Sequence, residues 1–225
     1  MTAGALLAAP ALWVAYTWGS HALTLGCRWR GERTGRKIAL TFDDGPDPET
    51  TPRVLDILAA ADARASFFLV GERVTREPGL VRRIAETGHD LGNHSWSHRS
   101  LWLAGPRRTV DEVRRGHEAI AQAAGVPPRF FRPPWGMTNL VLFPVLHRLG
   151  TPCVFWTVQT EGQRPASAAL QVERARRRAT PGAILDLHDA DGVPGAGRRL
   201  VEALPSMIDT LRGEGYTLAP LSDLL

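Results

Sequence analysis

Strand-like and helix-like segments alternate along most of this chain, and that order limits the folds it can adopt. Short apolar runs predict strands over residues 37–42, 65–70, 129–132, 152–158, 183–188 and 216–218. Between them, apolar residues recur every three or four positions, which predicts helices over residues 52–61, 79–87, 107–124, 139–149, 168–179 and 198–212. A repeated strand-then-helix order favours a parallel sheet covered by helices. Periodicity alone fits an open, doubly wound sheet and a barrel equally well.

Length and composition indicate a single folded unit without a nucleic-acid partner. The chain has 225 residues, of which 44% are hydrophobic, enough for one sizeable core. Its net charge of +4 comes almost wholly from arginine, because Lys37 is the only lysine. Arginine pairs such as Arg82 and Arg83 are scattered over the polar faces of predicted helices, so we expect no binding to nucleic acid.

Two adjacent carboxylates stand in residues 41–46, Thr-Phe-Asp-Asp-Gly-Pro, where a predicted strand gives way to a turn. Successive side chains on a strand point to opposite faces. A strand end that turns into a Gly-Pro loop can instead aim one carboxylate at a cation and leave the other as a base. A solvated turn is the simpler interpretation of Asp-Gly-Pro by itself.

His94 and His98 lie four positions apart in the stretch Asn-His-Ser-Trp-Ser-His. A helical turn would stack them on one face, with both rings able to reach a single ion. Catalytic zinc sites often use two histidines and one carboxylate, and Asp44 can be the third ligand. In His-Glu-x-x-His proteases the base lies between the histidines, but that position is Ser95 here, so Asp43 is the nearest source of a base.

Two further segments carry polar side chains at the ends of predicted strands. Prolines rigidify residues 132–136, Arg-Pro-Pro-Trp-Gly, and a guanidinium there can hold and orient Asp43. Residues 184–188 are typical of a buried strand that ends in His188, where a general acid would protonate a leaving group. Motifs at the carboxyl ends of strands match the position of active sites in α/β barrels.

Together these four segments resemble the polysaccharide deacetylase family, the NodB homology domain of carbohydrate esterase family 4. The resemblance rests on Thr-Phe-Asp-Asp-Gly, His-Ser-x-x-His, Arg-Pro-Pro-Trp-Gly and Leu-x-Leu-His in this order, and it covers roughly residues 37–225. It implies an α/β fold in the form of a distorted, incomplete (β/α) barrel of about seven strands.

The resemblance also implies a role for each motif residue. It assigns the metal to Asp44, His94 and His98, the base to Asp43, the orientation of that base to Arg132 and the acid to His188. It places the Trp135 backbone N–H at the oxyanion and Leu187 beside the substrate. It implies one divalent metal ion as cofactor, with zinc preferred to cobalt, nickel, manganese or iron.

One family motif, Asp-x-x-Asp-Trp after the fourth predicted strand, is missing from this chain. The sequence continues there as Gln-Thr-Glu-Gly, with Glu161 one residue out of register, and we interpret Glu161 as a loop charge. In the family these groups tune the acid histidine. We hypothesise that Asp186, on the same strand face as His188, replaces the lost carboxylate. It would pair with His188 or Arg132 while Gln159 hydrogen-bonds nearby.

The N-terminal residues 1–27 contain no Asp, Glu, Lys or Arg and are long enough to cross a bilayer as an apolar helix. Because a basic n-region is absent, we expect a membrane anchor rather than a cleaved signal peptide. A basic linker over residues 28–36 and the catalytic domain over residues 37–225 would follow. The arginines of the linker favour a cytoplasmic domain. A polysaccharide substrate requires an extracytoplasmic one, which we expect despite the charges.

Only two cysteines are present, Cys27 beside the predicted anchor and Cys153 at the start of a predicted strand. Neither has metal-ligand spacing. The sequence predicts two free thiols rather than a disulfide.

The sequence therefore predicts a monomeric, metal-dependent hydrolase that removes N-acetyl groups from N-acetylglucosamine units of peptidoglycan or a chitin-like polymer. The ion would polarise the amide carbonyl and the attacking water, Asp43 would take the proton of that water, and His188 would protonate the leaving amine. Two alternatives stay open. One is a deacylase or deformylase of a lipid-linked sugar, and the other is a carbohydrate-binding module without turnover.

Overall fold

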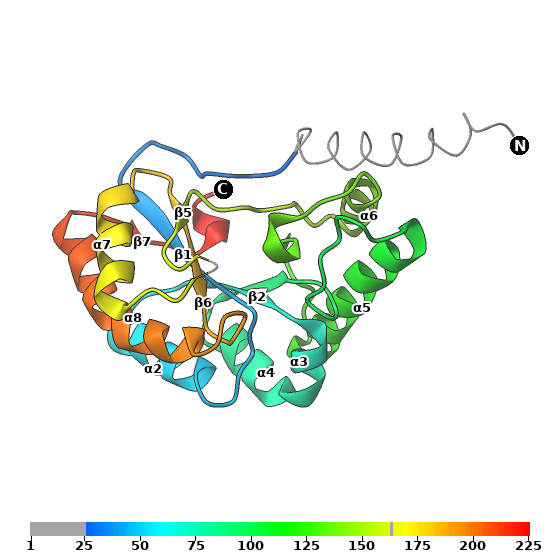
Figure 1. The fold of residues 1–225 in the computed structure, drawn as a ribbon, viewed down its shortest axis with the longest axis horizontal. Coiled ribbons are helices and arrows are strands. Elements are labelled where there is room, and N and C mark those ends of the chain that lie inside the picture. The colour runs from blue at the N-terminus through cyan, green and yellow to red at the C-terminus, as the bar shows by residue number, and fades with distance from the viewer. Residues whose placement is uncertain (1–25, 163) are drawn as a thin grey trace, which may run out of the picture.

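The computed structural model describes residues 26–162 and 164–225. The apolar segment predicted over residues 1–27 lies almost wholly outside these ranges. Within them, no helix combines the length and the apolar character that a bilayer crossing requires. The described chain folds around a parallel sheet flanked by helices (Figure 1).

Seven strands form the sheet, and each paired neighbour runs parallel. They are β1 (Lys37–Asp43), β2 (Ser66–Leu69), β3 (Asp90–Asn93), β4 (Phe130–Phe131), β5 (Val158–Gln159), β6 (Ile184–His188) and β7 (Thr217–Leu218). Their order is β4-β3-β2-β1-β6-β5, with β7 paired to the start of β1. Among the described residues the end strands β4 and β5 do not pair with each other. The expected incomplete barrel is therefore confirmed.

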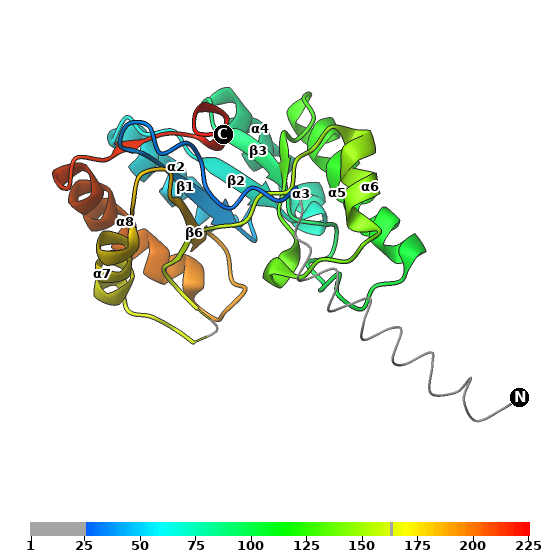
Figure 2. The same cartoon turned by 90° about the horizontal axis from the view of Figure 1, so that it is seen from above.

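The helices cover the sheet in two groups (Figures 1 and 2). One group comprises α2 (Thr51–Ala60), α7 (Ala168–Arg178) and α8 (Ala196–Gly213), and the other comprises α3 (Gly71–Arg76), α4 (Pro78–Glu86), α5 (Pro106–Ala124) and α6 (Leu142–Leu149). The apolar stripes of all these helices except α6 face the sheet and bury the main core, and α6 packs into a separate apolar cluster.

The two faces of the sheet bury different side chains. On β1, Ile38, Leu40 and Phe42 belong to the main core beneath the helices. Ala39 belongs to a second cluster on the opposite, inner face. Because side chains alternate along a strand, Asp43 continues that inner face at the carboxyl end. The inner face is thus where polar side chains collect.

The structure corrects the predicted elements in three places. The strand predicted over residues 152–158 is reduced to isolated bridges at Cys153 and Val154, and the short strand β5 begins only at Val158. Neither α3 nor β3 shows in the sequence pattern. The sequence of β3, Asp-Leu-Gly-Asn, has no apolar run, and pairing with β2 and β4 on either side makes it a strand. Gly92 is required there because a Cβ would lie 2.4 Å from the Phe68 ring.

Residues predicted as a basic linker run along the edge of the domain (Figure 1). The Arg28 N–H donates to the Cys153 carbonyl oxygen at 2.8 Å, and the Phe155 N–H donates to the Arg28 carbonyl oxygen at 2.8 Å. The Trp29 ring stacks on Phe155 with centroids 4.1 Å apart. Further along, the Gly31 N–H donates to the Gly182 carbonyl oxygen at 2.8 Å. This part of the predicted linker is packed against the domain.

Candidate active site

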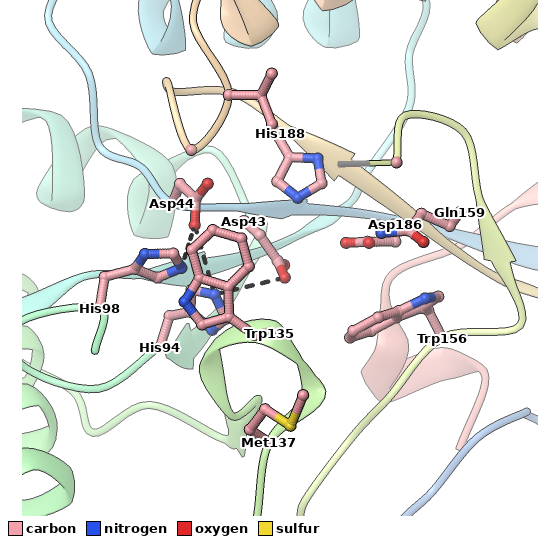
Figure 3. Close-up of a pocket in the computed structure, with 13 residues that line it drawn as sticks. Asp43, Asp44, His94, His98, Trp135, Met137, Trp156, Gln159, Asp186 and His188 are labelled. Carbon is pink, nitrogen blue, oxygen red and sulfur yellow. Dashed lines mark ion pairs between the residues drawn. The ribbon is translucent and has the colours of Figure 1, made fainter. Parts of the chain in front are cut away.

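Loops at the carboxyl ends of the strands meet in a pocket of about 210 Å³ (Figure 3). The pocket is lined by Asp43, Asp44, His94, His98, Trp135, Gln159, Asp186 and His188, which are all the residues assigned to the site from the sequence except Arg132 and Leu187. In a parallel barrel all strands end on the same side, so residues far apart in sequence gather there.

The backbone turns between the two adjacent carboxylates and gives them different surroundings. Asp43 ends β1, whereas Asp44 has a left-handed backbone with a φ of 74°. That conformation costs a non-glycine residue roughly 1–3 kcal/mol and persists where surrounding contacts hold it. Gly192 accommodates the turned side chain, since a Cβ there would lie 2.2 Å from Asp44 Oδ2. Both carboxylates are buried.

His94 and His98 reach Asp44 from an irregular loop. The predicted helical turn is wrong, because Ser95 and His98 have left-handed backbones with φ of 67° and 56°. The two rings still lie with centroids 5.0 Å apart. His94 Nδ1 donates to the Arg132 carbonyl oxygen at 2.7 Å, which fixes the tautomer and leaves Nε2 facing Asp44 Oδ1 at 3.5 Å. His98 Nε2 lies 2.9 Å from the same oxygen.

A buried carboxylate on α5, Glu112, holds this histidine loop in place. It accepts hydrogen bonds from the Trp96 N–H at 3.1 Å, the Ser97 N–H at 2.8 Å and the Ser97 hydroxyl at 2.6 Å. Sequence reasoning misses Glu112, because an acid on a charged helix is typical of a solvated face. Glu112 is buried because it accepts hydrogen bonds from the backbone N–H groups of a loop that lies some fifteen residues earlier in the chain.

Asp44, His94 and His98 suit a divalent metal ion. One ligand atom from each lies within 4.8 Å of the others. Asp44 Oδ1 is buried and accepts no hydrogen bond in the described structure, although both imidazoles face it. Burial opposes ionisation of Asp44, but the two histidines hold its pKa well below its usual range. Two imidazole nitrogens and an ionised carboxylate are a donor set that zinc and similar ions favour.

Arg132 lies beneath Asp43 and is fully buried. Its Nη1 donates to Asp43 Oδ1 and to Thr41 Oγ1, both at 2.7 Å. Its Nε and Nη2 donate to the carbonyl oxygens of Val154 and Phe155 at 3.2 and 3.0 Å. A planar guanidinium tied at three nitrogens has one orientation. Asp43 is therefore held in one rotamer with Oδ2 left free of Arg132.

Asp186 and His188 follow each other on the inner face of β6, opposite Thr41 and Asp43 in the register. Asp186 Oδ1 lies 3.7 Å from Arg132 Nη1, and among the described residues no ion pair joins Asp186 directly to His188. Burial raises the pKa of Asp186 to about 7. Burial works against a charge on His188, but the surrounding carboxylates, with Asp186 foremost, raise its pKa above the usual value.

Glu161 is not the loop charge that the sequence predicts. It is buried, and its Oε1 accepts hydrogen bonds from Arg199 Nε at 2.8 Å and the Ala166 N–H at 3.1 Å. Arg199 lies on α8, so the pair joins the loop that follows β5 to the first turns of α8. Gln159 is exposed, and its amide makes no hydrogen bond within the described structure. The hydrogen bond predicted for Gln159 is thus not found among the described residues.

Another buried acid, Asp189, packs against the turn that follows β1. The Thr51 hydroxyl donates to Asp189 Oδ2, and a Cβ on Gly45 would lie 2.6 Å from that oxygen. Burial raises the pKa of Asp189 to about 7. No sequence motif points to this role.

Aromatic and apolar side chains complete the pocket wall. Trp135, within a 3₁₀ turn (Pro134–Gly136), is 52% exposed, and its ring centroid lies 5.3 Å from that of His98. Trp156 and Met137 also line the pocket, and the sequence motifs do not identify either (Figure 3).

Leu187 is not at the pocket, and its assignment beside the substrate is wrong for the side chain. It is fully buried in the main core. Strand alternation sends Leu187 to the helix-facing side of β6, whereas Asp186 and His188 point inward.

Comparison with known proteins agrees with this geometry. A family model described as polysaccharide deacetylase matches residues 30–154, more than half of the chain. The peptidoglycan-N-acetylglucosamine deacetylase PgdA of Listeria monocytogenes is 33% identical over 192 residues, which cover 85% of this chain. They cover 39% of the Listeria protein, so the chain spans about two fifths of that relative.

Solved structures show the same likeness. The Bc1960 peptidoglycan N-acetylglucosamine deacetylase superimposes with a TM-score of 0.84 at 30% identity, over 95% of this chain and 97% of that one. A CE4 family pseudoenzyme from Bacillus anthracis superimposes with a TM-score of 0.79 at 26% identity, over 87% and 67% of the two chains. In sequence and in fold, this chain belongs to the polysaccharide deacetylase family.

Proposed function

We propose that the chain is a metal-dependent hydrolase that removes N-acetyl groups from N-acetylglucosamine units of a polysaccharide, with peptidoglycan preferred to a chitin-like polymer. The main support for this proposal is that Asp43 lies between a possible metal site and a candidate general acid. An Asp-His-His donor set lies on one side, and His188 lies opposite on the neighbouring strand. Amide hydrolysis needs both an activated water and an acid for the leaving amine.

Asp44 Oδ1 and the Nε2 atoms of His94 and His98 would hold the metal ion. A divalent ion bound there supplies Lewis acidity, which polarises the amide carbonyl and lowers the pKa of the attacking water. Zinc suits the donor set best, with cobalt, nickel, manganese and iron as further candidates. The Arg132 carbonyl and Gly192 position His94 and Asp44 for this task.

Asp43 accepts the proton of the attacking water. Arg132 occupies Asp43 Oδ1 at 2.7 Å, which leaves Oδ2, 3.7 Å from His94 Nε2, directed toward the metal site. A base that is already oriented needs no rearrangement when the water attacks.

His188 donates a proton to the leaving amine. Burial lowers the pKa of His188, but the nearby carboxylates raise it above the usual value. The imidazolium therefore persists toward neutral pH. The Trp135 backbone N–H faces the oxyanion, while Trp156 and Met137 provide an apolar wall for the acetyl methyl group. The exposed Trp135 ring offers a sugar-stacking surface.

A deformylase or deacylase acting on a lipid-linked sugar is the second candidate. Two observations favour it: the altered loop after β5, with Glu161 tied to Arg199, and the arginines that follow the predicted anchor. A non-catalytic carbohydrate-binding module is the third candidate, since a pseudoenzyme shares the fold. The presence of base, ligands and acid in this chain argues against it.

A panel of acylated sugars separates these candidates. The metal-loaded protein is incubated with peptidoglycan, N-acetylglucosamine oligomers, their N-formyl counterparts and a lipid-linked N-formyl sugar. We expect acetate from the first two and little product from the formyl substrates. Formate release from the lipid-linked sugar alone would favour the second candidate, and binding without any product would favour the third.

Asp186 is expected to maintain His188 as an acid. Asp186→Asn removes a charge that raises the pKa of His188, so that pKa should fall. Because the acid works in its protonated form, activity is lost as pH rises through this pKa. The alkaline limb of the profile of kcat/KM against pH should therefore move to lower pH, with a slower rate at pH 7. An unchanged profile and rate would rule the role out.

We also propose that residues 1–27 anchor a monomeric catalytic domain on the extracytoplasmic side of the membrane. Support comes from the substrate named for the relatives, peptidoglycan, which lies outside the cytoplasm. Protease accessibility in intact cells tests this placement, since a cytoplasmic domain would be protected.

A further inference from the structure

The two cysteines of the chain lie on adjacent extended segments. Arg28 and Val154 form a parallel bridge, in which the Arg28 N–H donates to the Cys153 carbonyl oxygen at 2.8 Å. Cys27 and Cys153 each precede one of the bridged residues. Because side chains alternate in step along parallel neighbours, the two thiols share the face opposite Arg28 and Val154.

The spacing of the two residues suits a covalent link. Neighbouring strands lie about 4.8 Å apart, inside the window of roughly 4.4–6.8 Å between Cα atoms that a disulfide spans. Cys153 is buried in an apolar cluster, and the partly exposed Cys27 packs against that same cluster. The Cys153 thiol lowers the pKa of Cys27, while Cys27 and burial raise the pKa of Cys153 well above its usual value. Cys27 is thus the more readily ionised and the more accessible thiol.

We propose that Cys27 and Cys153 form an intramolecular disulfide when the chain meets a disulfide-bearing oxidant of an oxidising compartment. The Cys27 thiolate attacks one sulfur of that oxidant, forms a mixed disulfide and releases the first thiol. Cys153 then loses its proton, attacks Cys27 Sγ and releases the second thiol. Two protein thiols are oxidised, and one oxidant disulfide is reduced to two thiols.

The disulfide would link the segment that follows the predicted anchor to the segment whose carbonyl oxygens hold Arg132. The carbonyl oxygens of Val154 and Phe155, next to Cys153, accept two of the hydrogen bonds that fix Arg132. Trp29, two residues after Cys27, stacks on Phe155. The disulfide therefore crosslinks these two extended segments beside the arginine that orients Asp43.

The test uses the full-length chain in detergent, equilibrated with oxidised glutathione and then treated with an alkylating reagent. We expect no alkylated cysteine, a mass loss of two hydrogen atoms, and a linked pair of Cys27 and Cys153 peptides in a non-reduced digest. Cys153→Ser should stop the reaction at a glutathione adduct on Cys27. Two alkylated thiols in the equilibrated wild-type chain, or linkage only between separate chains, would overturn the proposal.

Cys27→Ser is the matched control, because this position is partly exposed and the substitution spares the core. Relative to the oxidised wild type, its thermal midpoint should be lower by ~5–15 °C, and reductant should lower only the wild-type midpoint. A wild-type midpoint that does not respond to reductant would contradict a stabilising crosslink between Cys27 and Cys153. Neither readout depends on deacetylase activity, so the proposal stands or falls separately from the proposed function.

Discussion

Asp43→Asn should lower kcat at least ~10²-fold while leaving the metal content of the protein nearly unchanged, because it removes the proton acceptor but none of the three ligands. The amide retains an oxygen for the hydrogen bond from Arg132 Nη1, which is 2.7 Å long in the wild type, so the local packing is preserved. Metal analysis and steady-state kinetics on the same sample separate these two effects.

Asp44→Asn is the matched control, because it makes the same chemical change one residue later. It removes an ionised ligand whose pKa is held well below its usual range, and it should lose both metal and activity. Wild type, Asp43→Asn and Asp44→Asn would then give three distinct combinations of metal content and rate. If the two variants behaved alike in both assays, the division between base and ligand would be wrong.

Exhaustive chelation should abolish hydrolysis, and zinc, cobalt or another divalent ion should restore it. The reason lies in the ligand set: among the described residues, Asp44, His94 and His98 form the cluster able to hold an ion, and that ion would lower the pKa of the attacking water. Near-full recovery on re-addition shows that the fold survives the treatment. A protein that stays fully active with no detectable metal would refute the assignment.

The positions of the catalytic groups at strand ends can be predicted from the sequence. Asp43 and His188 each stand at the end of an apolar run that predicts a strand. In a parallel sheet the carboxyl ends of all strands lie on the same side, so both residues are expected there. Strand alternation likewise predicts that Asp186 shares a face with His188, as the pocket lining bears out. The same rule, applied to Leu187, would have excluded it from the pocket.

Tertiary partners decide the features that the sequence does not reveal. Glu161 is buried because Arg199, far along the chain, supplies its counter-charge. Glu112 is buried because a loop with left-handed residues offers it N–H groups. Local spacing cannot report either contact. The neighbourhood of Cys27 and Cys153 likewise depends on a bridge between Arg28, in a segment without a strand pattern, and Val154, in a predicted strand far along the chain.

The most direct test of the proposed function is the N-acetylglucosamine oligomer arm of the substrate panel, in which the acetate and the free amine released by the metal-loaded protein are both measured. We expect equal amounts of both products, formed in repeated turnovers, with none after Asp44→Asn. A metal-loaded, folded protein that binds the oligomer and releases neither product would contradict it.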